Sequence, residues 1–232
     1  MKDNQFKDRT YKDWNKFIKN EIPSSLDIFP ILYENIKHGD KIVDIGCGYG
    51  KTCFQLAFAN YGPILGFDIN ISAIQYANEY LKKLSENIKS NLRFEVHDAL
   101  CTQLNTDTFD VGIMQAFLTT LTTPEDRQKA MNEARRIIKR GGSLYLAVFI
   151  QTWHSEKYFV RYLKGIEETG EEGSFYVRNK ETGQVEYQAH HYTEKEIILL
   201  LKNAGFSCSY FNYENFVSRS GNLVNGAVIW AN

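Results

Sequence analysis

The chain has 232 residues, of which 43% are hydrophobic and 24% charged, and this composition is typical of a globular protein that buries one substantial core. The formal net charge of -1 provides no overall positive field, which argues against nucleic acid or an anionic membrane as a partner. The four cysteines form no C-x-x-C pair, so neither a disulfide framework nor a metal site is predicted.

The first residues, MKDNQFKDRTYKDW, mix charges throughout and contain no apolar signal core. No later apolar run is long enough to cross a bilayer. We therefore expect a soluble, cytoplasmic protein with no membrane partner.

Two helices are expected before the first strand. Aromatic residues recur at helical spacing in the first of them, with Tyr11 and Trp14 on roughly one face, which predicts an amphipathic helix. The second helix covers residues 24–38, and Pro30 should kink or restart it. Residues 1–38 are thus predicted to form an N-terminal helical cap on a single domain that covers residues 1–232.

Strands alternate with helices from Lys41 to Ile150. Parallel strands need crossover connections, and helices at this spacing supply them, so the pattern predicts a mainly parallel sheet with helices on both faces. The predicted strands cover residues 41–45, 64–69, 92–99, 109–117 and 143–150, and the predicted helices cover residues 51–62, 72–88 and 124–140.

The alternation of strands and helices is interrupted over residues 151–192, which are predicted to form an insertion and a possible lid over the active site. Within it, residues 174–189 have the alternation of a β-hairpin. The acidic run EETGEE before the hairpin is predicted to be a solvated loop. After the insertion, a helix over residues 194–205 and two strands over residues 206–215 and 222–232 complete the predicted elements.

The stretch VDIGCGYGKT raises the question of which ligand its glycines approach, since glycine lets the backbone lie close to a ligand. A phosphate-binding P-loop would need glycine in place of Ile45, and a dinucleotide fingerprint would need glycine in place of Lys51. Asp44, at the end of the first strand, would repel a pyrophosphate and attract a cationic group. The loop is therefore predicted to hold a ligand that is positively charged near Asp44.

Two more acidic residues lie at the ends of the next predicted strands. Asp68 ends the second strand, where doubly wound sheets bind ribose hydroxyls, and Asp98 ends the third. A sheet without a ligand has no need of three such carboxylates. Helix capping is the alternative for Asp44, and a structural role is the alternative for Asp98.

In order and spacing, the segments VDIGCGYG, GFDIN, HDA, FDVGIMQAFLTTL and RIIKRGGSLYLAVF resemble the successive motifs of class I S-adenosylmethionine-dependent methyltransferases. The resemblance covers residues 35–150. It implies an α/β fold with a doubly wound, seven-stranded, mainly parallel sheet, helices on both faces, an N-terminal helical segment and a hairpin insertion after the fifth strand. It also implies S-adenosylmethionine as the cofactor and S-adenosylhomocysteine as the product.

The resemblance assigns contacts with the cofactor to residues at the ends of four predicted strands. They are Gly46, Cys47 and Gly48 under the methionine portion, Asp44 near its ammonium group, Asp68 at the ribose hydroxyls, Ile69 on the adenine ring, Asp98 and Ala99 at the adenine edge, and Gln115 and Ala116 beside the methionyl group.

The sequence departs from the family pattern at two places. The segment FLTTL follows the fourth strand where many relatives carry a histidine pair, which removes one base from the site. Arg140 stands where proline is usual. Neither departure touches the predicted cofactor contacts.

The methyl acceptor is predicted to be a small-molecule metabolite with an N, O or S nucleophile. The fourth strand carries MQAF in place of the N/D-P-P-Y/F sequence of methyltransferases that act on adenine or glutamine amides, and the net charge argues against a large polyanion. By resemblance to small-molecule methyltransferases, the N-terminal cap and the insertion would roof the active site; core packing and an oligomer contact are the alternatives. The residues expected to contact the acceptor are Tyr11, Trp14, Phe117, His154 and Tyr192.

A base is needed only for a protonated acceptor, because the sulfonium donor is already activated. His190 and His191 are predicted to orient the acceptor or to take its proton near neutral pH. The alternative is that they help to seat the N-terminus of the following helix. Other functions left open are a non-catalytic S-adenosylmethionine-binding protein, a methyltransferase acting on a macromolecule, and an NAD-linked oxidoreductase, which Lys51 and Asp44 disfavour.

Overall fold

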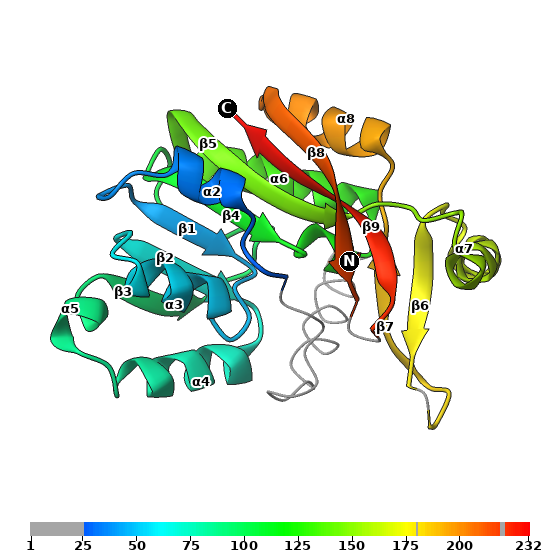
Figure 1. The fold of residues 1–232 in the computed structure, drawn as a ribbon, viewed down its shortest axis with the longest axis horizontal. Coiled ribbons are helices and arrows are strands. Elements are labelled where there is room, and N and C mark those ends of the chain that lie inside the picture. The colour runs from blue at the N-terminus through cyan, green and yellow to red at the C-terminus, as the bar shows by residue number, and fades with distance from the viewer. Residues whose placement is uncertain (1–25, 180, 219–220) are drawn as a thin grey trace.

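The computed structural model describes residues 26–179, 181–218 and 221–232, in which seven strands form one sheet of order β3-β2-β1-β4-β5-β9-β8 (Figure 1). The first five strands pair in parallel, and β9 is antiparallel to both β5 and β8. The strands are β1 (Ile42–Ile45), β2 (Ile64–Asp68), β3 (Leu92–Val96), β4 (Phe109–Gln115), β5 (Ile138–Phe149), β8 (Cys208–Val217) and β9 (Leu223–Ala231).

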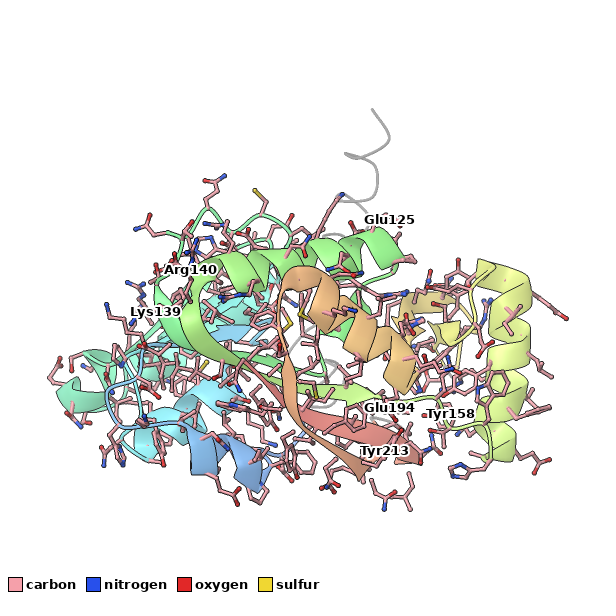
Figure 2. The ribbon with its side chains drawn as sticks, turned by 90° about the horizontal axis from the view of Figure 1, so that it is seen from above. Glu125, Lys139, Arg140, Tyr158, Glu194 and Tyr213 are labelled. Atoms are coloured by element: carbon pink, nitrogen blue, oxygen red, sulfur yellow. The ribbon has the colours of Figure 1, made fainter. Side chains whose placement is uncertain are left out.

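Helices cover both faces of this sheet, which confirms the predicted doubly wound α/β fold. One apolar cluster lies between the sheet and the helices α2, α3 and α4, and a second lies between the sheet and α6 and α8. Figure 2 shows α6 and α8 lying next to each other. The helices of the sheet layer are α2 (Pro30–Asn35), α3 (Lys51–Phe58), α4 (Ile71–Leu81), α5 (Glu86–Lys89), α6 (Pro124–Ile137) and α8 (Glu194–Ala204).

The N-terminal cap is only partly described. The prediction of a helix over residues 24–38 is wrong at both ends, because residues 26–29 are not helical and α2 runs only from Pro30, its first residue, to Asn35. Tyr11 and Trp14 lie outside the described residues. Among the helices that the structure does describe, none has both the length and the apolar character needed to cross a membrane.

The prediction of a helix over residues 124–140 is wrong at its end. Helix α6 stops at Ile137, and Ile138 already pairs with Phe109 as the first residue of β5. The register of β4 and β5 then shifts before Val111 pairs with Ser143, so the intervening residues, with Gly141 in the left-handed region, form an irregularity within the strand and not a helix cap.

The insertion forms a unit of its own at the far end of the sheet from β3 (Figure 1). Its predicted hairpin is confirmed, with β6 (Ser174–Arg178) antiparallel to β7 (Val185–His190). The prediction of a solvated loop over residues 167–172 is wrong in its first half, because residues 167–169 belong to the last turn of helix α7 (Glu156–Thr169), whereas residues 170–172 lie outside any helix or strand. A bridge between Ile150 and Tyr192 joins the two ends of the insertion.

Candidate active site

The predicted cofactor contacts lie where the carboxyl ends of the neighbouring parallel strands meet, as expected for a parallel sheet. Asp68 joins two of these ends. Its Oδ2 accepts the backbone N–H of Gly48 at 2.9 Å, and its Oδ1 accepts that of Asn70 at 2.8 Å. Burial raises the pKa of Asp68, although the N–H groups of Asn70 and Gly48 oppose this shift.

Asp44 is a buried acid with 3% of its surface exposed. Its Oδ2 accepts a hydrogen bond from the Cys53 thiol at 3.2 Å. Burial raises the pKa of Asp44 to about 7, the Cys53 bond opposes this rise, and the charge of Asp68 adds to it. No described cation pairs with Asp44, so the site fits a ligand that brings a positive charge. The N-cap of α3 is Gly50, which removes helix capping as an explanation for Asp44.

The glycines of the loop serve different purposes. Gly46 has φ +74°, and a Cβ there would clash with the ring of Phe117, which packs against it. Gly48 has φ +54°, and no described atom lies within 4 Å of the place where its Cβ would stand. The loop is therefore closely packed at Gly46 and open at Gly48, so a ligand could approach its backbone at Gly48.

Gln115 is the last residue of β4, and only one of the two polar atoms of its side-chain amide makes a hydrogen bond with a described residue. Its Nε2 donates to the carbonyl of Leu26 at 2.5 Å, while its Oε1 is buried and accepts no hydrogen bond from any described residue. A buried acceptor without a donor is unfavourable, so Oε1 fits a ligand that donates an N–H or O–H. The next residue, Ala116, has φ +56°, a strained conformation of the kind that clusters at ligand sites.

The remaining predicted cofactor contacts occupy the same edge of the sheet. Ile69 is half-buried directly after Asp68. Asp98 accepts the N–H of Leu100 at 2.9 Å, which supports the structural alternative for this residue, and half-buried Ala99 lies between them. Burial raises the pKa of the Cys47 thiol to about 11, so this cysteine is a neutral packing group and not a nucleophile.

His190 and His191 are both buried, with 1% and 4% of their surfaces exposed. The Nδ1 of His190 lies 2.9 Å from the Ser174 hydroxyl, and its Nε2 lies 2.9 Å from Oε1 of Glu196, so both ring nitrogens already have protein partners. His191 stacks on Phe149, and burial lowers its pKa well below the usual value. This arrangement favours the structural alternative over a role as base.

The predicted acceptor contacts lie in different environments. Phe117 packs against the glycine loop at Gly46. His154 is exposed before the start of α7. Tyr192 is fully buried, and its hydroxyl donates to the carbonyl of Leu118 at 2.8 Å, which gives this side chain a packing role.

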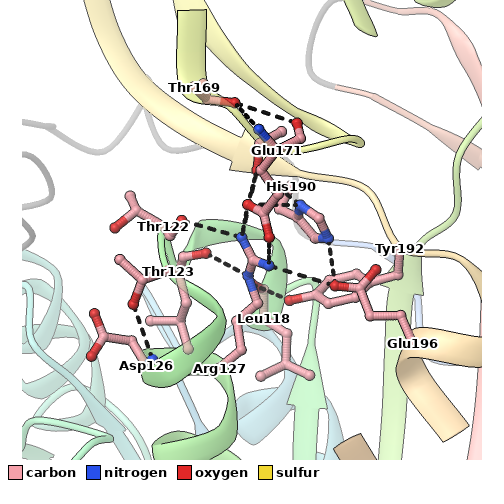
Figure 3. Close-up of polar contacts among 12 residues, drawn as sticks. Leu118, Thr122, Thr123, Asp126, Arg127, Thr169, Glu171, His190, Tyr192 and Glu196 are labelled. Atoms are coloured by element: carbon pink, nitrogen blue, oxygen red, sulfur yellow. Dashed lines mark hydrogen bonds and ion pairs between the residues drawn. The ribbon is translucent and has the colours of Figure 1, made fainter. Parts of the chain in front are cut away.

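Sequence reasoning missed a buried ion-pair network around Arg127 (Figure 3). A signal for it was present, because Arg127 lies on the face of α6 that also carries the buried Ala130, Met131 and Ala134. Glu171, His190 and Glu196 each offer one atom that could bind a metal ion, and these three atoms lie within 4.8 Å of one another. The Arg127 guanidinium already supplies the positive charge there, with Nη1 2.6 Å from Glu171 Oε1 and 3.5 Å from Glu196 Oε1.

Residues 36–205 match the family described as methyltransferase domain. Among solved structures, the chain is similar to a SAM-dependent methyltransferase from Methanosarcina mazei, with a TM-score of 0.85 and 40% identity over 89% of this chain and 98% of that one.

Curated relatives are more distant. The 27-O-demethylrifamycin SV methyltransferase of Amycolatopsis mediterranei is 30% identical over 50% of this chain and 40% of its own length. The tRNA N(3)-cytidine methyltransferase METTL2 of Mus musculus is 29% identical over 77% of this chain and 43% of its own length. The chain thus spans less than half the length of these curated relatives.

Proposed function

The chain belongs to the S-adenosylmethionine-dependent methyltransferases, and on this premise we propose that it transfers the methyl group of S-adenosylmethionine to an N, O or S nucleophile of a small-molecule metabolite. The observation that carries the proposal is the pairing of the buried Asp44 carboxyl with the open position at Gly48. Together they offer charge and room to the cationic methionyl part of the cofactor.

The residues at the edge of the sheet would each hold a different part of the cofactor. Asp44 would face its ammonium group, and Oε1 of Gln115 would accept an N–H from the same region. Asp68 keeps lone pairs for the ribose hydroxyls after accepting the N–H groups of Gly48 and Asn70. Ile69 would pack on the adenine ring.

When bound, S-adenosylmethionine supplies a methyl group that is already activated on its sulfonium sulfur. The protein's part is then to hold the acceptor in line with that bond and to exclude water. Histidine base catalysis is not part of this proposal, because both nitrogens of His190 are occupied and His191 is buried.

We also propose that residues 1–232 act as one domain in which the cap over residues 1–38 and the insertion over residues 151–192 enclose the acceptor. Support for the insertion comes from Gln188, whose Nε2 donates to the carbonyl of Thr122 at 3.2 Å. This bond places the hairpin against the segment that follows β4. That segment begins beside the cofactor loop, at Phe117.

A macromolecular acceptor is the second candidate. The longer alignment, over 77% of this chain, is with a tRNA methyltransferase, whereas the rifamycin relative matches 50% of it. The net charge of -1 favours the small molecule, since binding to a polyanion depends on neutralising its phosphates with lysine and arginine.

Incubation with methyl-labelled S-adenosylmethionine and a cell extract, separated into metabolite, RNA and protein fractions, tests the proposal. We expect label in the metabolite fraction, and none when the Gly48→Val variant replaces the wild type. Label confined to RNA or protein would establish the second candidate. Tight cofactor binding without label in any fraction would indicate a non-catalytic binding protein.

A further inference from the structure

The buried network around Arg127 ties the insertion to the body of the protein (Figure 3). The Arg127 side chain is fully buried and binds both carboxylate oxygens of Glu171, with Nη1–Oε1 2.6 Å and Nη2–Oε2 2.7 Å. Hydrogen bonds from Arg127 and Ser174 hold the pKa of Glu171 low, although burial alone would raise it. A bidentate pair of this kind fixes the relative positions of α6 and the insertion.

The same guanidinium holds the chain that follows β4, residues 116–123, which we call the post-β4 segment. Nε of Arg127 donates to the carbonyl of Leu121 at 3.0 Å, and Nη2 donates to that of Thr122 at 3.2 Å. Two insertion side chains bind this segment as well, Gln188 at Thr122 and Tyr192 at Leu118. The conformation of the post-β4 segment therefore depends on the insertion.

The other end of the post-β4 segment lies against the cofactor loop. Phe117 packs on Gly46, and the N–H of Ala116 donates to the carbonyl of Ala147 at 2.8 Å. Ala116 is in the left-handed region, and such a residue stays there only where its surroundings determine the backbone strongly. Arg127 holds the opposite end of the same short segment, at the carbonyls of Leu121 and Thr122.

We propose that Arg127 is a positioning residue that couples the insertion to the cofactor site through the post-β4 segment. The contacts run from Glu171 to Arg127, from Arg127 to the Leu121 and Thr122 carbonyls, and along the segment to Phe117 on Gly46. Coupling between two sites is reciprocal, so a ligand that fixes Phe117 also stabilises the docked insertion. The inference rests on the proposed function, since it takes the loop at Gly46 as the cofactor site.

A substitution in the insertion, away from the loop, tests the coupling. Glu171→Gln keeps the size of the side chain and removes its charge, and we expect S-adenosylhomocysteine to bind roughly 2- to 30-fold more weakly by titration calorimetry. The matched control is Glu168→Gln, in the same insertion, which breaks an ion pair of 2.8 Å with Arg178 and leaves the post-β4 segment untouched. The control should bind like the wild type.

Unchanged affinity in a folded Glu171→Gln protein would overturn the coupling. Failure of the wild type itself to bind S-adenosylhomocysteine would overturn the proposed function instead, so the two failures are distinguishable. In an Arg127→Lys background, Glu171→Gln should weaken binding no further, because the lysine cannot hold the carboxylate and both carbonyls at once. Additive losses would contradict the proposal.

Hydrogen exchange separates positioning from general stability. In Arg127→Lys, the amides of residues 116–123 and 171–192 should exchange faster together, while those of β1 and β2 keep their wild-type rates. If amide exchange became equally faster in all strands, Arg127 would contribute to general stability and not to positioning. If the lysine variant does not fold, the same hydrogen-exchange measurement is made on the double variant Arg127→Met, Glu171→Met, which removes both charges of the pair.

Discussion

The carboxylate of Asp68 holds the glycine loop to the end of β2, because it accepts the backbone N–H of Gly48 at 2.9 Å. The residue proposed to bind the ribose hydroxyls thus also fixes the loop proposed to carry the methionine portion. Loss of the Asp68 carboxylate should therefore weaken binding of both the ribose and the methionine portion of the cofactor.

The Asp68→Ala variant should bind S-adenosylmethionine more weakly by on the order of 1 to 3 kcal/mol, because buried polar partners lose their acceptor. Titration calorimetry measures this loss. The matched control is Asp110→Ala, which removes another carboxylate that accepts a backbone N–H, that of Lys41 at 2.9 Å, at the start of β4. Equal affinities for the Asp68 variant and the wild type would refute the assignment.

The Gly48→Val variant should lose cofactor binding, because its side chain would fill the space that is open at this position. Gly141→Val is the control, since Gly141 also has a positive φ and no described atom within 4 Å of its Cβ position, but lies far from the site in β5. Both variants carry backbone strain of roughly 1 to 2 kcal/mol. Equilibrium dialysis should separate them, and equal binding by both would identify the Gly48 loop as a structural turn.

The buried Asp44 should make the stability of the ligand-free protein depend on pH. Its pKa is raised from 3.8 to about 7, so the folded protein holds this proton more tightly than the unfolded chain does. The resulting stabilisation is complete below pH 3.8 and is lost as the pH rises to about 7. The free energy of unfolding in urea, measured across this pH range for the wild type and for Asp44→Asn, should show this decrease in the difference between the two proteins. A difference that does not change with pH would contradict the shifted pKa.

Cofactor binding should release the same proton. A cationic ligand beside Asp44 lowers the pKa of this carboxyl, so binding near pH 6.5 should expel up to about one proton. Calorimetry in two buffers of different ionisation enthalpy counts the protons released. The Asp44→Asn variant should release none, and equal release by the variant would place the titrating group elsewhere.

The double variant His190→Ala, His191→Ala tests the role of both histidines. Loss of His190 removes one buried hydrogen bond from Ser174 and one from Glu196, so we expect a fall in unfolding free energy of about 1 to 3 kcal/mol. Turnover of the labelled acceptor per folded molecule should stay close to that of the wild type. A loss of about 100-fold at a temperature where the variant is folded would instead restore the assignment of a general base.

The parts of this fold that sequence patterns predicted are those set by local chemistry. The strand-loop-helix unit at Asp44 to Lys51 follows from an apolar run, glycines and a helix start. Helix α7 was not among the predicted elements; it contains Gly165, a residue that lowers helix propensity, at a place where a Cβ would clash with the carbonyl of Ser174 on β6. Such a requirement depends on a neighbour that the local sequence does not reveal.

The candidate site divides in the same way. Asp68 and Gly48 were predicted because strand ends in parallel sheets meet at one edge. The partners of His190 come from residues 174 and 196, one in the hairpin and one in α8, and no spacing rule links them. These contacts occupy both ring nitrogens of His190, which favours the structural alternative for this residue.

The bridge between Ile150 and Tyr192 means that the chain leaves the sheet and returns to it at adjacent points. A lengthened or shortened insertion can therefore be accommodated without moving β5 or α8. In evolutionary terms, the length of residues 151–192 is free to vary, whereas the residues that tie the insertion to Arg127 and to the post-β4 segment, among them Glu171 and Gln188, are constrained.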